Sequence, residues 1–194
     1  MQHERDMETV VMHTWPRPAP LPGTSVWPRV VGDLTGYGRS TRTAVPETFN
    51  PHLITHGHGT FEGPEGKVTI GPGDAFCLWP GVPHDFREDP DDPWHFYWMR
   101  LEGEQTEDVA RAMGFAPDRR VRRPEDPDRA IRAFQALFEH YAAEDRDAYR
   151  AASLFFEFVA ACRKPEPRAA RNTDRRLVQE ARALVESLLE TGLN

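Results

Sequence analysis

The stretch that decides the fold runs from His52 to Leu101 and reads HLITHGHGTFEGPEGKVTIGPGDAFCLWPGVPHDFREDPDDPWHFYWMRL. Runs of β-forming residues (HLIT, KVTI, AFCLW and HFYWMRL) alternate here with turns rich in glycine and proline. Many short strands at regular spacing, separated by turn residues, are typical of a small closed barrel. Such a barrel has room inside for one small ligand. The functional question is therefore whether the barrel holds a metal ion that does chemistry or a ligand that is sensed.

The residues before this stretch differ in kind. Residues 1–25 are polar and then rich in proline, a composition that excludes a helix or a central strand, so we expect an extended arm. Both a free tail and a lid over the barrel mouth fit this composition. Residues 26–101 are expected to form the barrel itself.

After Gly103 the spacing of apolar residues changes from the alternation typical of strands to the spacing of three and four residues typical of helices. A short helix is expected at 104–113, followed by a loop at 119–123 that carries four arginines. The helices of residues 102–163 are expected to pack on the barrel and to leave apolar surface for a partner subunit. The predicted class is therefore α+β and mainly β, with a barrel followed by a helical dimerisation segment.

The boundaries of the longer helices are marked in the sequence. Asp126-Pro127 has the form of an N-cap followed by proline at the first helical position. The apolar stripe after it is spaced by three and four residues and consists of Ile131, Phe134, Leu137, Phe138 and Tyr141. Another helix is expected from about Asp147 to Cys162. Residues 164–194 are expected to be a linker and the first helix of a module that is cut short.

Composition excludes several classes of protein. The formal net charge of −7 argues against a chain that is itself a general nucleic-acid binder. The two cysteines, Cys77 and Cys162, lie in apolar runs and are expected to be buried thiols rather than a disulfide framework. No stretch approaches the roughly 20 apolar residues of a membrane span, and the N-terminus does not have the form of a signal peptide. We expect a cytoplasmic protein without a membrane partner.

One constellation favours a metal site. His56-x-His58, Glu62 and His84 have the residue types of a three-histidine, one-carboxylate centre for iron, manganese, nickel or zinc. The spacing argues against it, because the pair His56-Gly-His58 leaves no room for a hairpin before Gly73. We therefore expect no metal and no cofactor, and keep a metal-dependent enzyme (an isomerase or a dioxygenase) as the alternative.

Three linked motifs carry a resemblance to a known family. They are Gly57-x-Gly59, the run from Gly73-Asp74 to Trp79-Pro80-Gly81-Val82-Pro83-His84, and Pro93-Trp94-x-x-Tyr97-Trp98 followed by Gly103. Together they resemble the N-terminal ligand-binding domain of AraC-family transcriptional regulators. The resemblance covers about residues 30–163. The last helix is similar to the opening helix of the DNA-binding domain in that family, and the rest of that domain is absent from the chain.

The resemblance implies a cupin-type jelly-roll barrel that binds a small effector, often a sugar, and a homodimer formed through the helices. It implies contact with DNA only through the missing C-terminal domain. Position by position, it assigns ligand contacts to His56, where the family usually has Arg, to Phe86, where it usually has Tyr, and to Trp98 as an aromatic platform. Phe96 takes a position that is His in the arabinose-binding pattern, so arabinose itself is not expected.

The residues alone support part of this site. On an alternating strand Phe96 and Trp98 share one face, and Tyr97 and Met99 share the other. One face must cover the barrel interior and the other the helices, and the pattern does not say which. Ile54, His56 and His58 are expected to share a face, as are His84 and Phe86.

The chemistry fits a sugar that stacks on an indole ring and hydrogen-bonds to polar side chains. His84 and Arg42 are added as candidate ligand contacts. The first hypothesis is thus a non-enzymatic sensor domain of a transcription regulator with a carbohydrate effector. The alternative is the metal-dependent enzyme.

Overall fold

The computed structural model describes residues 9–16, 24–36, 45–163 and 179. Internal contacts divide the chain into two units, Met1–Arg163 and Lys164–Asn194. The predicted linker and last helix, and also Arg42, lie outside the described residues apart from position 179.

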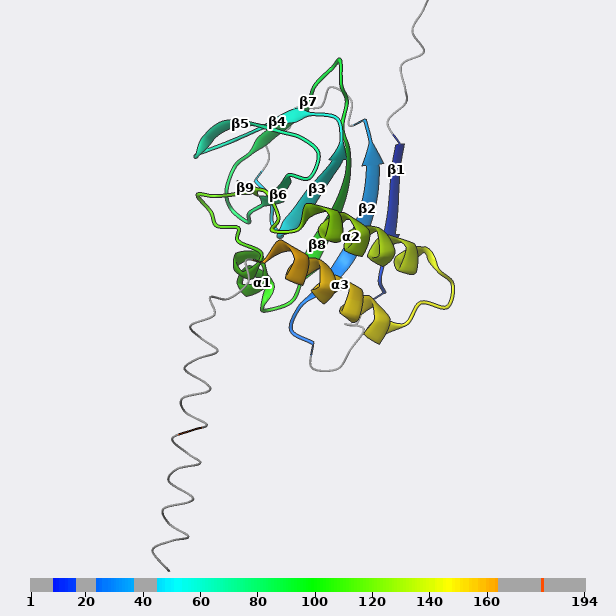
Figure 1. Ribbon diagram of the computed structural model, residues 1–194. Coiled ribbons are helices and arrows are strands. Elements are labelled where there is room, and N and C mark those ends of the chain that lie inside the picture. The colour runs from blue at the N-terminus through cyan, green and yellow to red at the C-terminus, as the bar shows by residue number, and fades with distance from the viewer. Residues whose placement is uncertain (1–8, 17–23, 37–44, 164–178, 180–194) are drawn as a thin grey trace, which may run out of the picture. The chain divides into compact units, whose positions relative to one another are not determined.

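The described strands form two antiparallel sheets (Figure 1). The larger sheet has six strands, in the order β1 (Thr9–Thr14), β2 (Trp27–Thr35), β8 (His95–Glu102), β3 (Asn50–His56), β6 (Ala75–Leu78) and β9 (Val121–Arg122). The smaller sheet has three strands, in the order β5 (Gly66–Ile70), β4 (Gly59–Gly63) and β7 (Asp85–Glu88). Apart from the pairs β1–β2 and β4–β5, neighbours in these sheets are not consecutive in sequence, as in a jelly roll, and the predicted mainly-β class is confirmed.

Alternation along β8 divides the core into two parts. Phe96 belongs to a buried cluster that also contains Phe61 of the small sheet, so this face of β8 is the inner one. Tyr97 and Met99 belong to a second cluster that contains the helical residue Phe134. The Tyr97 and Phe134 rings are nearly parallel, with centroids 5.4 Å apart. The structure thus assigns the two faces that the sequence left open.

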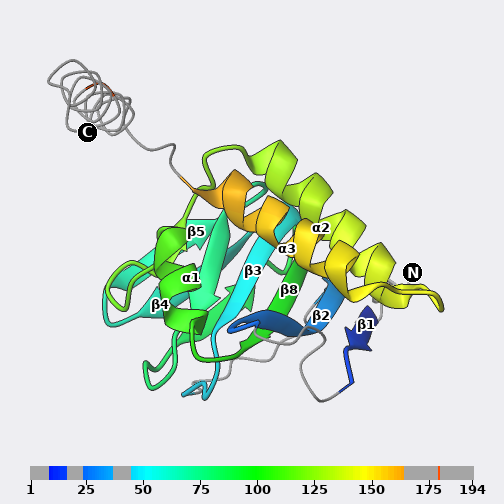
Figure 2. The same ribbon diagram turned by 90° about the horizontal axis from the view of Figure 1, so that it is seen from below.

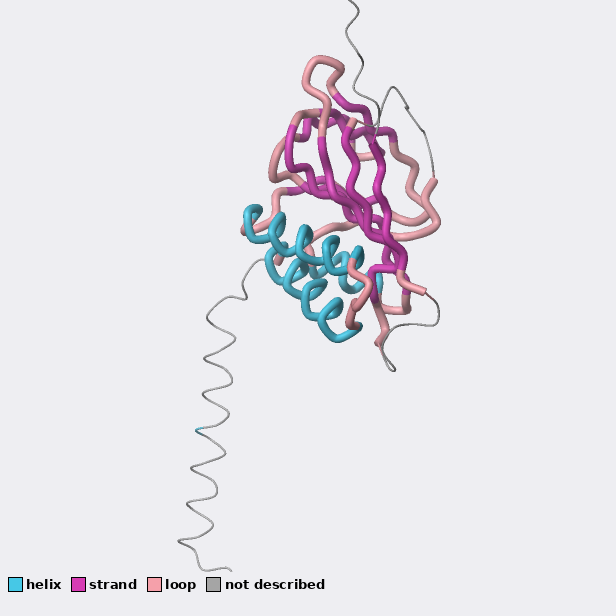
Figure 3. Tube along the Cα trace, turned by 90° about the vertical axis from the view of Figure 1, so that its right-hand side faces the viewer, coloured by secondary structure: helices cyan, strands magenta, loops and turns pink. Residues whose placement is uncertain are grey.

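The helices lie together on the outer face of the large sheet. They are α1 (Thr106–Ala112), α2 (Pro127–Ala142) and α3 (Ala148–Cys162). Figure 2 shows α2 and α3 side by side across β8 and β2, and Figure 3 shows that helices and strands occupy separate layers. The Tyr141 hydroxyl on α2 donates a hydrogen bond to the Pro28 carbonyl of β2 at 2.6 Å. This contact ties the helical layer to the sheet.

The predicted helix boundaries are confirmed. The Asp126 carboxylate accepts a hydrogen bond from the Arg129 amide at 3.0 Å, and Pro127 occupies the first position of α2. The Asp147 carboxylate caps α3 in the same way, through the Arg150 amide at 2.8 Å. Such caps satisfy amides that have no partner inside the helix.

Two strands lie outside the range predicted for the barrel. Within the expected N-terminal arm, β1 is extended and pairs with β2 from Thr9↔Thr35 to Thr14↔Val30. In the arginine-rich loop, Val121 and Arg122 form β9 and pair with β6. The large sheet therefore draws on chain before residue 26 and after residue 101.

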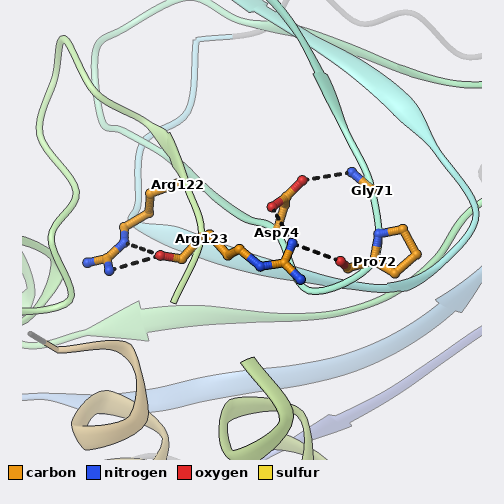
Figure 4. A network of polar contacts seen from close by, with 5 residues as sticks. All are labelled: Gly71, Pro72, Asp74, Arg122 and Arg123. Atoms are coloured by element: carbon orange, nitrogen blue, oxygen red, sulfur yellow. Dashed lines mark hydrogen bonds and ion pairs between the residues drawn. The ribbon is translucent and has the colours of Figure 1, made fainter. Parts of the chain in front are cut away.

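The arginine-rich loop also fastens the turn that begins the Gly73-Asp74 motif (Figure 4). The Asp74 carboxylate accepts hydrogen bonds from the Gly71 amide and from Arg123 Nη1, both at 3.0 Å. Arg123 Nη1 also donates to the Pro72 carbonyl at 3.1 Å. Gly73 has a φ of 85°, a conformation that other residues rarely adopt. The motif is therefore a structural turn at the start of β6.

Both cysteines are buried and free, as expected. Burial raises the pKa of Cys162 to about 12, and it raises the pKa of Cys77 as well. Neither thiol is a ready nucleophile, because the thiolate is the reactive form. Separately, within the described residues no helix has the length and apolarity needed to cross a membrane.

Candidate functional site: a cavity on the inner face of the large sheet

A cavity of about 360 Å³ opens on the inner face of the large sheet. Its polar lining residues are Asn50, His52 and His84. Its aromatic walls are Phe86, Phe96 and Trp98, and its aliphatic lining residues are Val10, Leu34, Pro46 and Leu78. Binding sites for small molecules usually have this size and this mixture of apolar walls with a few polar groups.

His52 lies on β3 between two aromatic rings. Its imidazole stacks on Phe76, with centroids 4.3 Å apart and planes 10° apart, and Trp98 lies nearly parallel at 6.3 Å. Its Nδ1 atom lies 2.8 Å from the Asn50 carbonyl oxygen. Because a carbonyl can only accept, Nδ1 carries the proton. Burial lowers the pKa of His52 to about 3, so the ring is neutral at pH 7.

His84 enters the cavity from the chain just before β7. Its side chain is buried, and its ring lies nearly parallel to Phe86, with centroids 5.7 Å apart. Burial, assisted by the positive charge of Arg120, lowers the pKa of His84. Its Nδ1 atom is buried and has no hydrogen-bond partner in the described part of the chain. An unpartnered buried nitrogen is unusual in a folded protein.

Trp98 forms one wall because its neighbour is a glycine. In the β2–β8 pairing Trp98 lies opposite Gly32, and in the β3–β8 pairing it lies opposite His52. A Cβ atom at Gly32 would overlap the Trp98 indole. Because Gly32 has no side chain, the Trp98 indole can lie against the backbone of β2.

Arg120 lies behind the cavity and is fully buried. Its Nε and Nη2 atoms donate to both oxygens of Glu65, at 3.0 and 2.7 Å. Nη1 donates to the Pro83 carbonyl at 3.1 Å, one residue before His84. The guanidinium lies 5.0 Å from the centroid of the Phe61 ring. Arg120 therefore fixes the loop that presents His84, and its charge is balanced by Glu65.

The structure places the predicted site residues in different surroundings. Phe86, Phe96, Trp98 and His84 all line the cavity. His56 is exposed and is not among the lining residues. Arg42 lies outside the described residues.

The face predicted for His56 is wrong, and a β-bulge is the reason. The pairing of β3 with β8 shifts between Ile54 and His56, so that one extra residue, Thr55, enters β3. His56 then lies opposite His95 instead of following Ile54 on the inner face. The rings of His56 and His95 are 6.0 Å apart.

The four candidate metal ligands do not come together. His58 Nδ1 lies 2.5 Å from the Asp92 carboxylate, and Glu62 is exposed on β4, whereas His84 lies in the cavity. Among the described residues there is no group of three or more His, Cys, Asp or Glu that could hold a metal ion. These residues therefore do not fit the metal centre of the alternative hypothesis.

Sequence reasoning missed His52, Asn50 and Val10 as lining residues. The signal for His52 was present, since it precedes Ile54 by two residues in the run HLIT and so shares its face. Asn50 lies two residues earlier on the same strand. Val10 comes from β1, within the expected arm, and its position at the cavity depends on the pairing of β1 with β2.

A two-sheet jelly roll with a ligand-sized cavity and packed helices is the architecture of cupin-type binding domains. A model of the AraC-like ligand binding domain matches residues 32–159, and the chain belongs to this family.

Individual relatives are more distant. The MmsAB operon regulatory protein of Pseudomonas aeruginosa is 27% identical over 139 residues, and the match covers 59% of this chain and 45% of that protein. This chain thus spans about half the length of that relative. Among solved structures, YhaK from Escherichia coli has a TM-score of 0.39 and 19% identity, covering 50% of this chain and 45% of that chain. A cupin 2 conserved barrel domain protein from Salinispora arenicola CNS-205 has a TM-score of 0.37 and 11% identity, covering 54% and 83%.

Proposed function

We propose that this domain senses a small-molecule effector for a cytoplasmic transcription regulator, and that it performs no catalysis. The observation that carries the proposal is the cavity, in which Trp98 and two buried histidines face a space of about 360 Å³. Membership of a family of ligand-binding domains supports the same function.

Binding must favour one of two states of the domain if it is to be a signal. Strand β1 is the element suited to this role, because among the described strands it lies at the edge of the large sheet and pairs with β2 alone. It also carries Val10 to the cavity. An effector that touches Val10 would stabilise the state in which β1 is paired. In this proposal β1 acts as a lid, one of the two roles that the sequence left open for the arm.

We further propose that the domain forms a homodimer through its helices and that DNA is bound by a part of the regulator outside this chain. Tyr149 and Phe156 support the dimer, because their side chains on α3 are 73% and 48% exposed. Their spacing of seven residues brings them to one face of the helix.

The sequence predicted a carbohydrate effector. Trp98 supports this prediction, since an indole can stack on the apolar face of a sugar. A sugar site also needs polar partners for the hydroxyl groups of the sugar. The lining of this cavity offers few polar side chains.

Two valines on β1 provide a direct test of the cavity. Val10 lines it, and Val11 is exposed to a similar extent on the opposite face of the strand. In a thermal-shift screen, an effector should stabilise the wild type and Val11→Trp and should have little effect on Val10→Trp, where the indole blocks the cavity. Equal stabilisation of all three proteins would show that the compound binds elsewhere and would contradict the proposal.

A further inference from the structure

We infer that the effector is a neutral, largely apolar molecule with a hydrogen-bond donor, and not a sugar or an organic anion. The inference rests on the proposed function of the cavity, and it adds the chemical class of the ligand.

The walls of the cavity set the first condition. Four lining side chains, those of Leu34, Leu78, Phe86 and Phe96, consist only of carbon and hydrogen. A sugar brings several hydroxyl groups, and each one buried without a partner loses about 1–3 kcal/mol. The Asn50 side chain, one of the few polar groups available, accepts a hydrogen bond from Thr48 at 3.1 Å and can donate through its amide N–H groups to one or two hydroxyls at most. Most hydroxyl groups of a sugar would therefore remain unpaired.

Charge sets the second condition. No Arg or Lys is among the lining residues of the described chain. Both imidazoles in the lining have a pKa lowered by burial, so neither supplies a positive charge at pH 7. The buried guanidinium of Arg120 is already paired with Glu65. A carboxylate or phosphate ligand would be desolvated here without a counter-charge among the lining residues, which is strongly unfavourable.

The tautomer of His52 sets the third condition. Its Nδ1–H donates to the Asn50 carbonyl, so Nε2 of the neutral ring is an acceptor. Because His52 lines the cavity, a hydroxyl or N–H group of the ligand can donate a hydrogen bond to this Nε2 atom. His84, which also lines the cavity, provides a second imidazole beside the ligand.

The size of the cavity is compatible with this class. Benzene binds in an apolar cavity of ~150 Å³ in another protein, and the space here is about 360 Å³. A single aromatic or branched aliphatic body with one polar substituent fits within it. Trp98 and Phe86 provide ring faces for such a body.

Four probes separate the possible classes: benzyl alcohol, benzyl methyl ether, benzoate and L-arabinose. They are titrated at millimolar concentration into the 194-residue chain, and binding is followed by chemical-shift changes of the Trp98 indole and the His52 ring. Benzyl alcohol is expected to bind most tightly. The ether should bind roughly fivefold or more weakly, because it cannot donate to His52 Nε2.

His52→Leu removes the acceptor and keeps an apolar side chain, and His56→Leu is the matched control on the same strand. The preference for the alcohol over the ether should disappear in His52→Leu and persist in His56→Leu. If His52→Leu does not fold, the order of the four probes on the wild type decides the question.

Three results would overturn the inference. Tightest binding of arabinose would restore the carbohydrate prediction and leave the proposed function intact. Tightest binding of benzoate would indicate a cation such as Arg100, which follows Trp98 on the same face of β8, and would also leave the function intact. No change at Trp98 or His52 with any probe would contradict the sensing function of the cavity as well.

Discussion

Buried His52 should make the stability of this domain decrease in mild acid. Burial lowers the pKa of His52 from 6.5 to about 3. In the unfolded chain the His52 imidazole therefore binds a proton near pH 6.5. In the folded chain it binds a proton only near pH 3. Between these values the unfolded state binds more protons, so the free energy of unfolding falls as the pH falls.

The magnitude follows from the width of the pH window. One proton of difference changes the free energy of unfolding by about 1.4 kcal/mol per pH unit. Between pH 6.5 and pH 5 the contribution of His52 is thus about 2 kcal/mol. Carboxylates add their own pH dependence, and so the comparison must be made with a variant that lacks only this imidazole.

Urea unfolding at pH 7 and pH 5 measures the effect in three proteins. The wild type should lose about 2 kcal/mol more than His52→Leu between the two values. The control His56→Leu removes an exposed imidazole from the same strand and should behave like the wild type.

An equal loss in the wild type and in His52→Leu would refute the reasoning. It would mean that His52 is protonated in the folded protein at pH 5. The case for a neutral acceptor in the cavity would then lose its basis.

Three further predictions concern other parts of the structure. Gly32→Ala should force the Trp98 indole into the cavity. Small-molecule binding should then be weaker, and the free energy of unfolding should fall by about 1–3 kcal/mol. Unchanged binding in calorimetry would contradict this prediction. Arg120→Met should destabilise by about 1–3 kcal/mol in urea, because it removes the hydrogen bonds to Glu65 and to the Pro83 carbonyl. The control Arg123→Met, at an exposed pair, should lose at most about 1 kcal/mol. Phe156→Ser should weaken the proposed dimer in sedimentation velocity experiments, and an unaltered dimer would exclude this face of α3 from the interface.

The sequence predicted the elements whose signals are local. The caps at Asp126 and Asp147 lie beside the apolar stripes that they introduce, and both helices begin there. Alternation in β8 gave the correct division of its residues between two faces. It did not identify the inner face, because both faces carry aromatic rings and the choice depends on packing against the small sheet.

Other features could not be predicted because they depend on strand pairing. The bulge at Thr55 reverses the face of His56 and is visible only in the register of β3 against β8. Strand β9 is two residues long and lies within an arginine-rich loop, so its local sequence gives no β signal. His52 is a different case, since its alternation with Ile54 could be read from the sequence.

The most direct test of the central claim is to follow the indole N–H signals of the chain during titration with benzyl alcohol. Trp98 lines the cavity, whereas Trp79 is buried in the core between the large sheet and the helices and serves as an internal control. The account predicts a saturable shift at Trp98 with little change at Trp79. A shift at Trp79 alone, or no saturable shift at either, would contradict a ligand site in this cavity.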